Sequence, residues 1–292
     1  MPRGGGWMKT KSALYPPGTA WEGEIDMDIK IVFSDIDGTI LNKHHQPTPR
    51  TVETIQRLCQ EGRPFVLVSA RMPRGVYTVQ RQLGITQPIV AYSGGLILDE
   101  KGDTLLSRGF CPAKALEIKG YVDHKGTCCS VYSGDQWYVD DQSDPWIQQE
   151  ITITKVTPIE GNMKDLLDGT SVVHKLLLMG QPQRIETLEQ ELKQRFEGLR
   201  IYRSKSTYLE IMDESASKSE AVKELCRLKG IPIEQSVSFG DHFNDIDMLA
   251  ATGMGFAMAN APRQVREMAN HVAKSNEEDG VARAICGLMG WQ

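Results

Sequence analysis

The sequence has no long uninterrupted run of apolar residues. A helix that crosses a bilayer needs about 20 of them, and no run in the 292 residues approaches that length. The N-terminal segment carries Arg3, Lys9 and Lys11 but lacks the apolar stretch of a secretory signal. We therefore expect no association with a membrane, and a cytoplasmic location.

The cysteines form no metal-binding or redox pattern. None of the six stands in a C-x-x-C pair, and no histidine lies at zinc-ligand spacing from them. This absence argues against a structural zinc site. It agrees with free thiols in a reducing compartment.

An excess of positive charge is also missing. Lys and Arg number 33 against 38 Asp and Glu, a net charge of −5, so the chain as a whole repels phosphate backbones and is a poor candidate for binding nucleic acid. Hydrophobic residues make up 40% and charged residues 24%, as in ordinary globular proteins. The length suggests about two domains.

Most of the chain alternates between strands and helices in the way that is typical of a parallel sheet. Short apolar runs at 29–33 and 65–68 suit buried strands, and 48–61 has the spacing of an amphipathic helix. The same alternation returns toward the C-terminal end. The sequence thus predicts an α/β, doubly wound parallel-sheet core built from residues 28–106 and 214–292.

The middle of the chain, residues 107–213, has a different pattern. Predicted strands at 127–132 and 136–139 are separated by a Gly-Asp pair, which is typical of a hairpin, and a further strand is expected at 172–179. Adjacent strands with short connections indicate an antiparallel sheet that carries helices. We therefore predict that 107–213 is an α+β module inserted in the core.

Residues 1–27 have no sustained apolar periodicity. They contain three prolines and five glycines, and Met27 stands just before the first predicted strand. We expect this segment to be an irregular extension that docks loosely, if at all, on the core.

Two aspartates follow the first predicted strand, in the segment Ser34-Asp35-Ile36-Asp37-Gly38-Thr39. Ligands bind beyond the carboxyl ends of parallel strands, and residues two apart on an extended chain point the same way. Asp35 and Asp37 can therefore face one crevice, with Gly38 permitting a sharp turn behind them. Taken alone, the motif is as compatible with a solvated turn as with a functional site.

A second polar cluster favours a functional interpretation. Asp241 follows the predicted strand 236–239, and Asn244 and Asp245 begin the next helix. A helix N-cap accounts for one Asp or Asn at such a position, but not for three beside a glycine. Oxygen ligands from two strand ends suit a hard divalent cation, and the lack of suitably placed Cys or His favours magnesium over zinc.

Two further features suit an anion beside that metal. Ser69-Ala70-Arg71 follows the strand 65–68, where a hydroxyl and backbone N–H groups can bind phosphate. Lys218 lies at the start of the predicted helix 219–229. A lone lysine is usually a solvated charge, but the helix dipole disfavours a cation at this end, so a phosphate partner would explain it.

Together these motifs resemble the haloacid dehalogenase (HAD) superfamily of phosphotransferases, and within it the Cof-like phosphatases of subclass IIB. The matching segments are Asp35-Ile-Asp-Gly-Thr-Ile, Ser69-Ala-Arg, Lys218 and Gly240-Asp-His-Phe-Asn-Asp. Motif order, spacing and the position of the insertion agree from about residue 28 onward. The resemblance implies a HAD-like Rossmannoid core with residues 107–213 as a substrate-specificity cap. It also implies a magnesium-dependent phosphatase that works through an aspartyl-phosphate.

The resemblance also implies residue roles. Asp35 would be the nucleophile, and Asp37 would protonate the leaving alcohol and later activate water. Asp35, Asp241 and the backbone carbonyl of Asp37 would hold the metal, with Asp245 supporting it. The phosphoryl group would be bound by Ser69, Ala70, Arg71, Lys218 and Asn244.

Several readings of the function remain open. Hydrolysis of a small phosphorylated metabolite, above all a sugar phosphate, is favoured. A phosphomutase or phosphotransferase on the same scaffold would use the same aspartyl-phosphate, and a catalytically silent binding protein would keep only the fold. The sequence does not show the oligomeric state or which cap residue faces the leaving group, among Trp137, Tyr138, Trp146, His174 and Arg203. The family often has Asn-Gly-Ala where Ser93-Gly94-Gly95 stands, in a loop that faces the leaving group in relatives.

Overall fold

The computed structural model describes residues 19–20 and 28–291. The predicted loosely docked extension consists mainly of residues 1–18 and 21–27, which lie outside the described residues. Thr19–Ala20, within the segment expected to be irregular, form strand β1. This strand pairs in parallel with β15 (His271–Ala273) and extends the edge of the first sheet.

The first sheet has nine strands among the described residues, in the order β1-β15-β14-β13-β2-β3-β4-β5-β6. Its central strands are β2 (Ile31–Ser34), β3 (Phe65–Val68), β4 (Ile89–Ala91), β13 (Ser236–Gly240) and β14 (Met254–Met258). Neighbouring strands from β1 to β4 are parallel. The predicted doubly wound α/β fold is confirmed.

The sheet is not parallel throughout, which corrects one detail of the prediction. Strands β5 (Leu96–Leu98) and β6 (Thr104–Ser107) run antiparallel at the edge next to β4. Only short turns precede β5 and β6, and a parallel strand needs a crossover of a dozen residues or more. The chain therefore reverses direction twice at this edge before it enters the second sheet.

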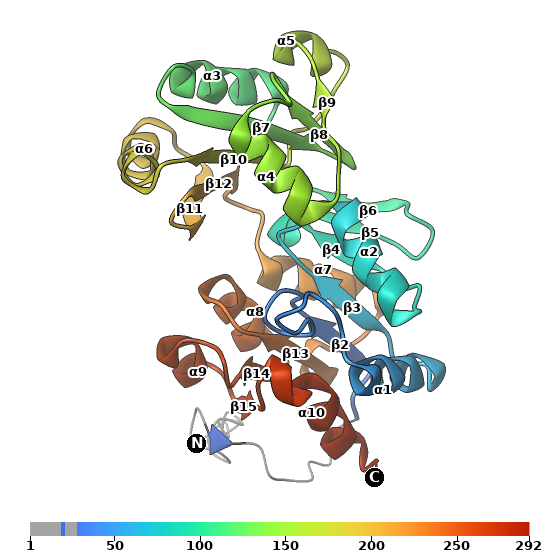
Figure 1. Cartoon of the computed structure of the whole chain (residues 1–292). Helices are drawn as coiled ribbons and strands as arrows, with labels where there is room; N and C mark the ends of the chain where they lie inside the picture. The colour runs from blue at the N-terminus through green and yellow to red at the C-terminus, as the bar shows by residue number, and fades with distance from the viewer. Residues whose placement is uncertain (1–18, 21–27, 292) are drawn as a thin grey trace, which may run out of the picture.

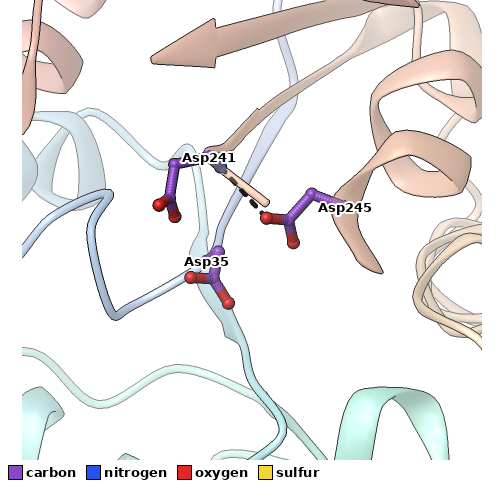
Figure 2. Close-up of side chains that lie close together, drawn as sticks. All are labelled: Asp35, Asp241 and Asp245. Carbon is purple, nitrogen blue, oxygen red and sulfur yellow. Dashed lines mark hydrogen bonds between the residues drawn. The ribbon is translucent and has the colours of Figure 1, made fainter. Parts of the chain in front are cut away.

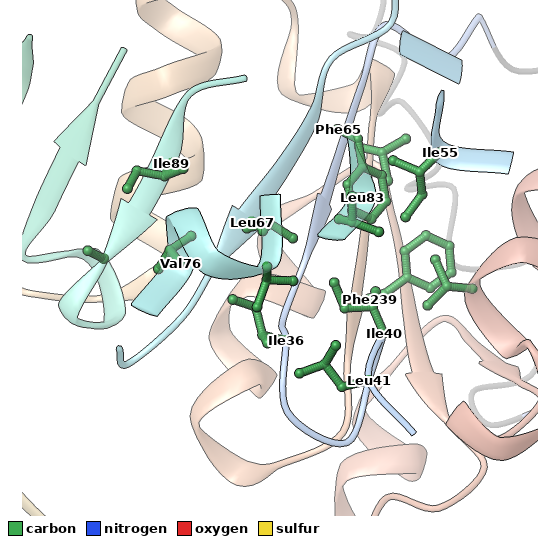
Figure 3. Close-up of a cluster of buried hydrophobic side chains, with 14 of the residues drawn as sticks. Ile36, Ile40, Leu41, Ile55, Phe65, Leu67, Val76, Leu83, Ile89 and Phe239 are labelled. Atoms are coloured by element: carbon green, nitrogen blue, oxygen red, sulfur yellow. The ribbon is translucent and has the colours of Figure 1, made fainter. Parts of the chain in front are cut away.

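Helices cover both faces of the first sheet because its strands are apolar on both sides. Val32 packs in one buried cluster, whereas Ile31 and Phe33 pack in another on the opposite face. The first cluster, part of which Figure 3 shows, includes side chains of α1 (Pro49–Gln60), α2 (Pro73–Leu83) and α10 (Gly280–Met289). The second includes side chains of α7 (Lys218–Lys229) and α8 (Ile246–Ala251), and α9 (Arg263–Met268) packs against α8.

The second sheet has the order β11-β12-β10-β7-β8-β9. Its strands are β7 (Thr127–Ser133), β8 (Gln136–Val139), β9 (Ile159–Glu160), β10 (Lys175–Gly180), β11 (Leu199–Lys205) and β12 (Tyr208–Asp213). The predicted hairpin is present as β7–β8. The β8–β9 pair is parallel rather than antiparallel. The strand expected at 172–179 begins only at Lys175, because Val173 instead bridges Phe110 outside the sheet.

The two faces of the second sheet have different partners. Helices α3 (Pro112–Val122) and α6 (Pro182–Arg195) pack on one face with a separate buried cluster, and the short helix α5 (Met163–Leu166) contributes to it. Apolar side chains of the other face, together with α4 (Pro145–Thr154), join the cluster of the first sheet. This second sheet therefore sits above the first as a distinct layer (Figure 1). No helix in the described part of the chain has the length and apolar character needed to cross a membrane.

Polar contacts join the two sheets. The chain leaves the first sheet after Ser107 and returns after Asp213. The Tyr92 hydroxyl donates to the carbonyl oxygen of Gly134 at 2.8 Å, and its ring stacks on His174 with centroids 5.1 Å apart. His174 is itself buried, and its Nδ1 accepts from the backbone N–H of Gly134 at 3.0 Å. The junction is thus ordered by buried polar groups as well as by apolar packing.

Burial of His174 predicts an acid-sensitive junction. Burial lowers the pKa of His174 to about 4 from 6.5. Between pH 4 and pH 6.5, His174 therefore binds more protons in the unfolded chain than in the folded chain. The contribution of neutral His174 to the free energy of unfolding, which is fully present above pH 6.5, is lost as the pH falls toward 4. We expect acidification from pH 7 to 4.5 to remove about 2 to 3 kcal/mol through this residue.

Urea unfolding at both pH values measures this effect. His174→Gln should show a smaller loss of stability on acidification than the parent. The exposed residue His44 provides the matched control, and His44→Gln should behave like the parent. If His174→Gln and the parent lose the same free energy of unfolding, His174 does not carry the acid sensitivity.

Candidate active site

The candidate site lies where three neighbouring strands end. Strand β2 pairs with β13 on one side and β3 on the other. Asp35 follows β2, Asp241 follows β13, and Ser69 follows β3. The backbone N–H of Asp35 donates to the carbonyl oxygen of Phe239 at 3.0 Å, which continues the pairing beyond the assigned strand. The parallel register therefore brings these three residues to the same edge of the sheet.

Gly38 makes close approach of the two acidic segments possible. Its φ is +78°, and a Cβ built there would lie 2.3 Å from Oδ2 of Asp241. The Thr39 hydroxyl donates to Oδ1 of Asp241 at 3.0 Å, and the Asn260 side chain donates to the carbonyl oxygen of Gly38 at 2.8 Å. A side chain at position 38 would push the Asp241 carboxylate out of the site.

Three carboxylates converge at this edge. Asp35, Asp241 and Asp245 each present an oxygen within 4.8 Å of those of the others (Figure 2). Lys218 is fully buried, and its Nζ lies 2.6 Å from Oδ1 of Asp35 and 2.5 Å from Oδ1 of Asp245. The other oxygen of Asp245 accepts from the backbone N–H groups of Asp241 and His242. Asp245 therefore orients both Lys218 and the segment that carries Asp241.

The carboxylates repel one another in spite of Lys218. Burial raises the pKa of Asp35 well above its ordinary value, and although Lys218 opposes this, Asp245 and Asp241 add to it. Burial and the charge of Asp245 raise the pKa of Asp241 to about 6. Burial would lower the pKa of Lys218, but the carboxylates of Asp245 and Asp35 outweigh it and raise that pKa. The site thus holds more negative charge than its one ammonium balances.

This charge imbalance fits a divalent cation. Three ionised carboxylates and one ammonium leave a net charge of −2, which one divalent cation would neutralise. All of the converging acidic donors are oxygens, the ligand type that hard cations prefer. The residues present therefore fit the kind of metal ion that the sequence predicts.

The remaining predicted residues surround these carboxylates. Asp37 is half-exposed and forms a two-bond ion pair with Arg71, whose Nε and Nη2 lie 2.8 and 2.5 Å from its oxygens. The guanidinium of Arg71 is thus engaged by Asp37. Ser69 is buried, and its hydroxyl accepts from the backbone N–H of Arg71 at 3.2 Å. Asn244 is half-buried in the short 3-10 helix η4 (Phe243–Asp245).

A strained loop also reaches the site. Tyr92 and Ser93 both have a positive φ, of 51° and 50°, and Gly94 has a φ of +105°. A Cβ at Gly94 would lie 2.1 Å from the carbonyl oxygen of Ser217, next to Lys218. Strained backbone of this kind clusters at functional sites. The loop brings Ser93 close to the residues that are predicted to bind phosphate. The backbone N–H of Ser93 donates to the carbonyl oxygen of Ser69 at 2.8 Å.

Residues of the second sheet approach the same edge, and the sequence did not identify them. The buried Lys175 donates from Nζ to the carbonyl oxygen of Ala70 at 3.1 Å and pairs with Glu210 at 3.1 Å. The sequence did contain a signal for this pair, since Lys175 and Glu210 each stand within an apolar strand. Charged residues are seldom fully buried without a partner, so each of them could have been expected to form an ion pair. Arg203, one of the earlier candidates, instead pairs with Glu189 of α6.

The fold and the site together define an α/β protein with a carboxylate and lysine centre at the strand ends of its first sheet, beneath an inserted second sheet. A family model for haloacid dehalogenase-like hydrolases matches residues 32–285. The chain belongs to this family, as its motifs predicted.

Curated relatives and solved structures agree with this assignment. A Haemophilus influenzae protein whose name provisionally assigns it as a phosphatase is 38% identical over 257 residues, which cover 88% of this chain and 97% of the relative. A 5-amino-6-(5-phospho-D-ribitylamino)uracil phosphatase of Bacillus subtilis is 28% identical and covers 90% of this chain and 99% of its own length. A haloacid dehalogenase-like hydrolase from Bacteroides thetaiotaomicron has a TM-score of 0.81 at 27% identity, covering 88% of this chain and 98% of that one. The chain is accordingly an enzyme, a phosphoric monoester hydrolase.

Proposed function

We propose that the enzyme is a magnesium-dependent phosphatase that hydrolyses a small phosphorylated metabolite, such as a sugar phosphate, through an aspartyl-phosphate on Asp35. The observation that carries the proposal is the charge of the site: three converging carboxylates beside a single buried lysine. Such a centre suits a divalent cation and an anionic substrate together. A carboxylate at the centre can attack phosphorus once the negative charge around it is neutralised.

The residues divide the reaction into two displacements. In the first, an oxygen of Asp35 attacks phosphorus, and the bond from phosphorus to the leaving oxygen breaks as Asp37 donates a proton to that oxygen. In the second, a water molecule gives a proton to Asp37 and attacks phosphorus, which releases inorganic phosphate and regenerates the Asp35 carboxylate. Asp37 thereby regains in the second displacement the proton that it gives in the first, and it can carry this proton only once it has left its ion pair with Arg71.

The surrounding groups hold the reactants. Lys218, which the carboxylates keep cationic, would bind a phosphoryl oxygen, together with Ser69, the backbone at Ala70, Arg71 and Asn244. Asp35, Asp241 and the backbone carbonyl of Asp37 would hold magnesium, with Asp245 in support. When bound, the metal would stabilise negative charge on the phosphoryl group. Residues 107–213 would act as the cap over the leaving group, on a core formed by 28–106 and 214–292.

Release of inorganic phosphate tests the proposal. The protein is incubated with magnesium and a panel of phosphomonoesters that includes sugar phosphates, polyol phosphates and p-nitrophenyl phosphate, with and without a bisphosphate activator. We expect phosphate release that does not need the activator. Isomerised sugar phosphate without net phosphate release would instead indicate a phosphomutase. Binding without turnover of any ester would indicate a catalytically silent protein.

A further inference from the structure

Helix α2 begins without a side-chain cap from its own N-cap residue. That residue is Met72, which makes no capping hydrogen bond to the described residues, and Pro73 after it has no N–H group. The backbone N–H groups of Gly75 and Val76 donate to the carbonyl oxygen of Met72, at 2.9 and 3.2 Å. The N–H of Arg74, in the same first turn, is therefore left to a partner outside the helix.

A turn of the second sheet supplies that partner. Asp135 lies between β7 and β8, and its Oδ1 accepts from the backbone N–H of Arg74 at 2.7 Å. Its Oδ2 accepts from Nε of the Arg74 side chain at 3.3 Å. An Asp that accepts from the second N–H position of a helix does what an N-cap residue does, but an N-cap normally precedes its helix directly. Asp135 instead follows Arg74 by 61 residues and belongs to the other sheet.

Lys175 contacts the same connection nearer its other end. Residues 69–72 join β3 to α2, and they include the hydroxyl and backbone groups that are predicted to bind phosphate. Nζ of the buried Lys175 donates to the carbonyl oxygen of Ala70 at 3.1 Å. Side chains of the second sheet therefore hold the chain at Ala70 and at Arg74, on either side of Arg71.

The turn that carries Asp135 is itself fixed in place. The carbonyl oxygen of Gly134 accepts from the Tyr92 hydroxyl of the first sheet at 2.8 Å. The N–H of Gly134 donates to Nδ1 of the buried His174 at 3.0 Å. A cap on such a support restrains the start of α2 instead of moving with it.

We propose that Asp135 is a positioning residue for phosphate binding: by capping α2 from the second sheet, it pre-organises residues 69–71 to receive the phosphoryl group. The proposal rests on the proposed phosphatase function. A segment that is already ordered in the free enzyme does not have to become ordered when phosphate binds, so the apparent affinity is higher. The second sheet thereby contributes to binding of the phosphoryl group, which is common to all substrates.

The sign of its charge distinguishes this role of Asp135 from a direct electrostatic effect. Asp135 is a half-exposed anion, and by charge alone it disfavours a phosphate in its neighbourhood. Removing the charge would then strengthen phosphate binding. A loss of phosphate affinity in Asp135→Ala would therefore come from the structure that Asp135 holds.

Competition by inorganic phosphate tests the proposal, with magnesium and p-nitrophenyl phosphate as the assay substrate. Asp135→Ala should raise the inhibition constant of phosphate by about 3- to 10-fold, the effect of one lost helix cap. KM for the ester should rise by a similar factor while kcat changes little, because the phosphoryl group is held in both the ground state and the transition state. Asp135→Asn should stay within about twofold of the parent, because an amide oxygen also caps a helix.

Asp144→Ala is the matched control. Asp144 caps α4, which packs against β7, and its Oδ1 accepts from the backbone N–H of Trp146 at 2.7 Å. This variant should lose thermal stability as Asp135→Ala does, but it should keep the parent's inhibition constant. A rise of this constant in Asp135→Ala alone supports the proposal. An unchanged constant in Asp135→Ala, or an equal rise in Asp135→Asn or in the control, overturns it.

The parent enzyme separates failure of this inference from failure of the proposed function. If the parent releases phosphate with magnesium and Asp135→Ala has the parent's inhibition constant, the phosphatase function stands and the positioning role is wrong. If the parent releases phosphate from no phosphomonoester, both the phosphatase proposal and the positioning role are overturned.

Discussion

Asp35→Asn is expected to lower kcat by about 10⁴- to 10⁶-fold, the range seen when a catalytic nucleophile is removed. The amide keeps the shape of the carboxylate but lacks its charge and its nucleophilic oxygen. Phosphate release from p-nitrophenyl phosphate with magnesium measures the effect. Mass spectrometry of the variant is needed as well, because deamidation would restore the aspartate.

The folded structure should tolerate this substitution. The raised pKa of Asp35 shows that, without a cation, the folded protein disfavours its charge, through burial and through Asp245 and Asp241. A neutral amide relieves this repulsion, and Lys218 keeps Asp245 as a partner. The melting temperature in EDTA should therefore not fall.

Asp28→Asn is the matched control for Asp35→Asn. Asp28 is exposed and lies before β2, at the opposite end of the same strand. It forms an ion pair with Lys30 and accepts a long hydrogen bond from the Gln235 side chain at 3.5 Å. This variant should keep the parent's activity. An Asp35→Asn protein of confirmed mass that retains more than a few per cent of the parent's kcat would rule out a covalent intermediate on Asp35.

Removal of divalent cations is expected to abolish activity, and magnesium should restore it. Three carboxylates beside one ammonium leave two negative charges where the substrate phosphate must bind. Without a cation, this charge repels the substrate, and burial together with this charge raises the pKa of Asp35 and of Asp241. Calcium should bind but support little turnover, because it favours larger and less regular coordination than magnesium.

Thermal unfolding provides a readout of the metal site that does not depend on activity. A cation that binds the folded state alone should stabilise it by about 2.7 kcal/mol at 100 times its Kd. Asp241→Asn should lose most of this stabilisation. Asp247→Asn should keep it, because an oxygen of Asp247 accepts from the backbone N–H of Met248 in α8 rather than joining the three carboxylates. Full activity after exhaustive chelation, or a requirement for zinc, would contradict the oxygen-ligand site.

Local chemistry explains which parts of the site were predictable. Asp35, Ser69 and Asp241 each follow an apolar strand, and the carboxyl ends of neighbouring parallel strands meet at one edge of the sheet. The order of strands and motifs was therefore enough to bring them together. That Lys218 binds phosphate stays a prediction, and the structure adds that its ammonium pairs with Asp35 and Asp245. A spacing pattern does not show which of several nearby anions a buried ammonium contacts.

The sequence pattern does not predict the contacts between the two sheets. Strand alternation places Tyr202 and Glu210 on one face of the second sheet, but it does not say which face meets the first sheet. That choice depends on how the chain crosses at Ser107 and Asp213, and on apolar packing shared by both sheets. Likewise, the reversal from β4 into β5 depends on the backbone conformation around Ser93 and Gly94.

The α/β fold, the family and the edge of the sheet that carries Asp35 and Asp241 were all predictable from the amino-acid sequence, because they follow from local periodicity and from residues adjacent to strand ends. Three contacts could be known only from the folded chain: Asp245 with Lys218, Arg71 with Asp37, and Lys175 of the second sheet with the carbonyl oxygen of Ala70. The two groups of features differ in the range of the interactions that produce them. A strand or helix is specified within a few residues, whereas an ion pair or a subsite depends on the packing of segments more than a hundred residues apart, such as Asp35 and Lys218.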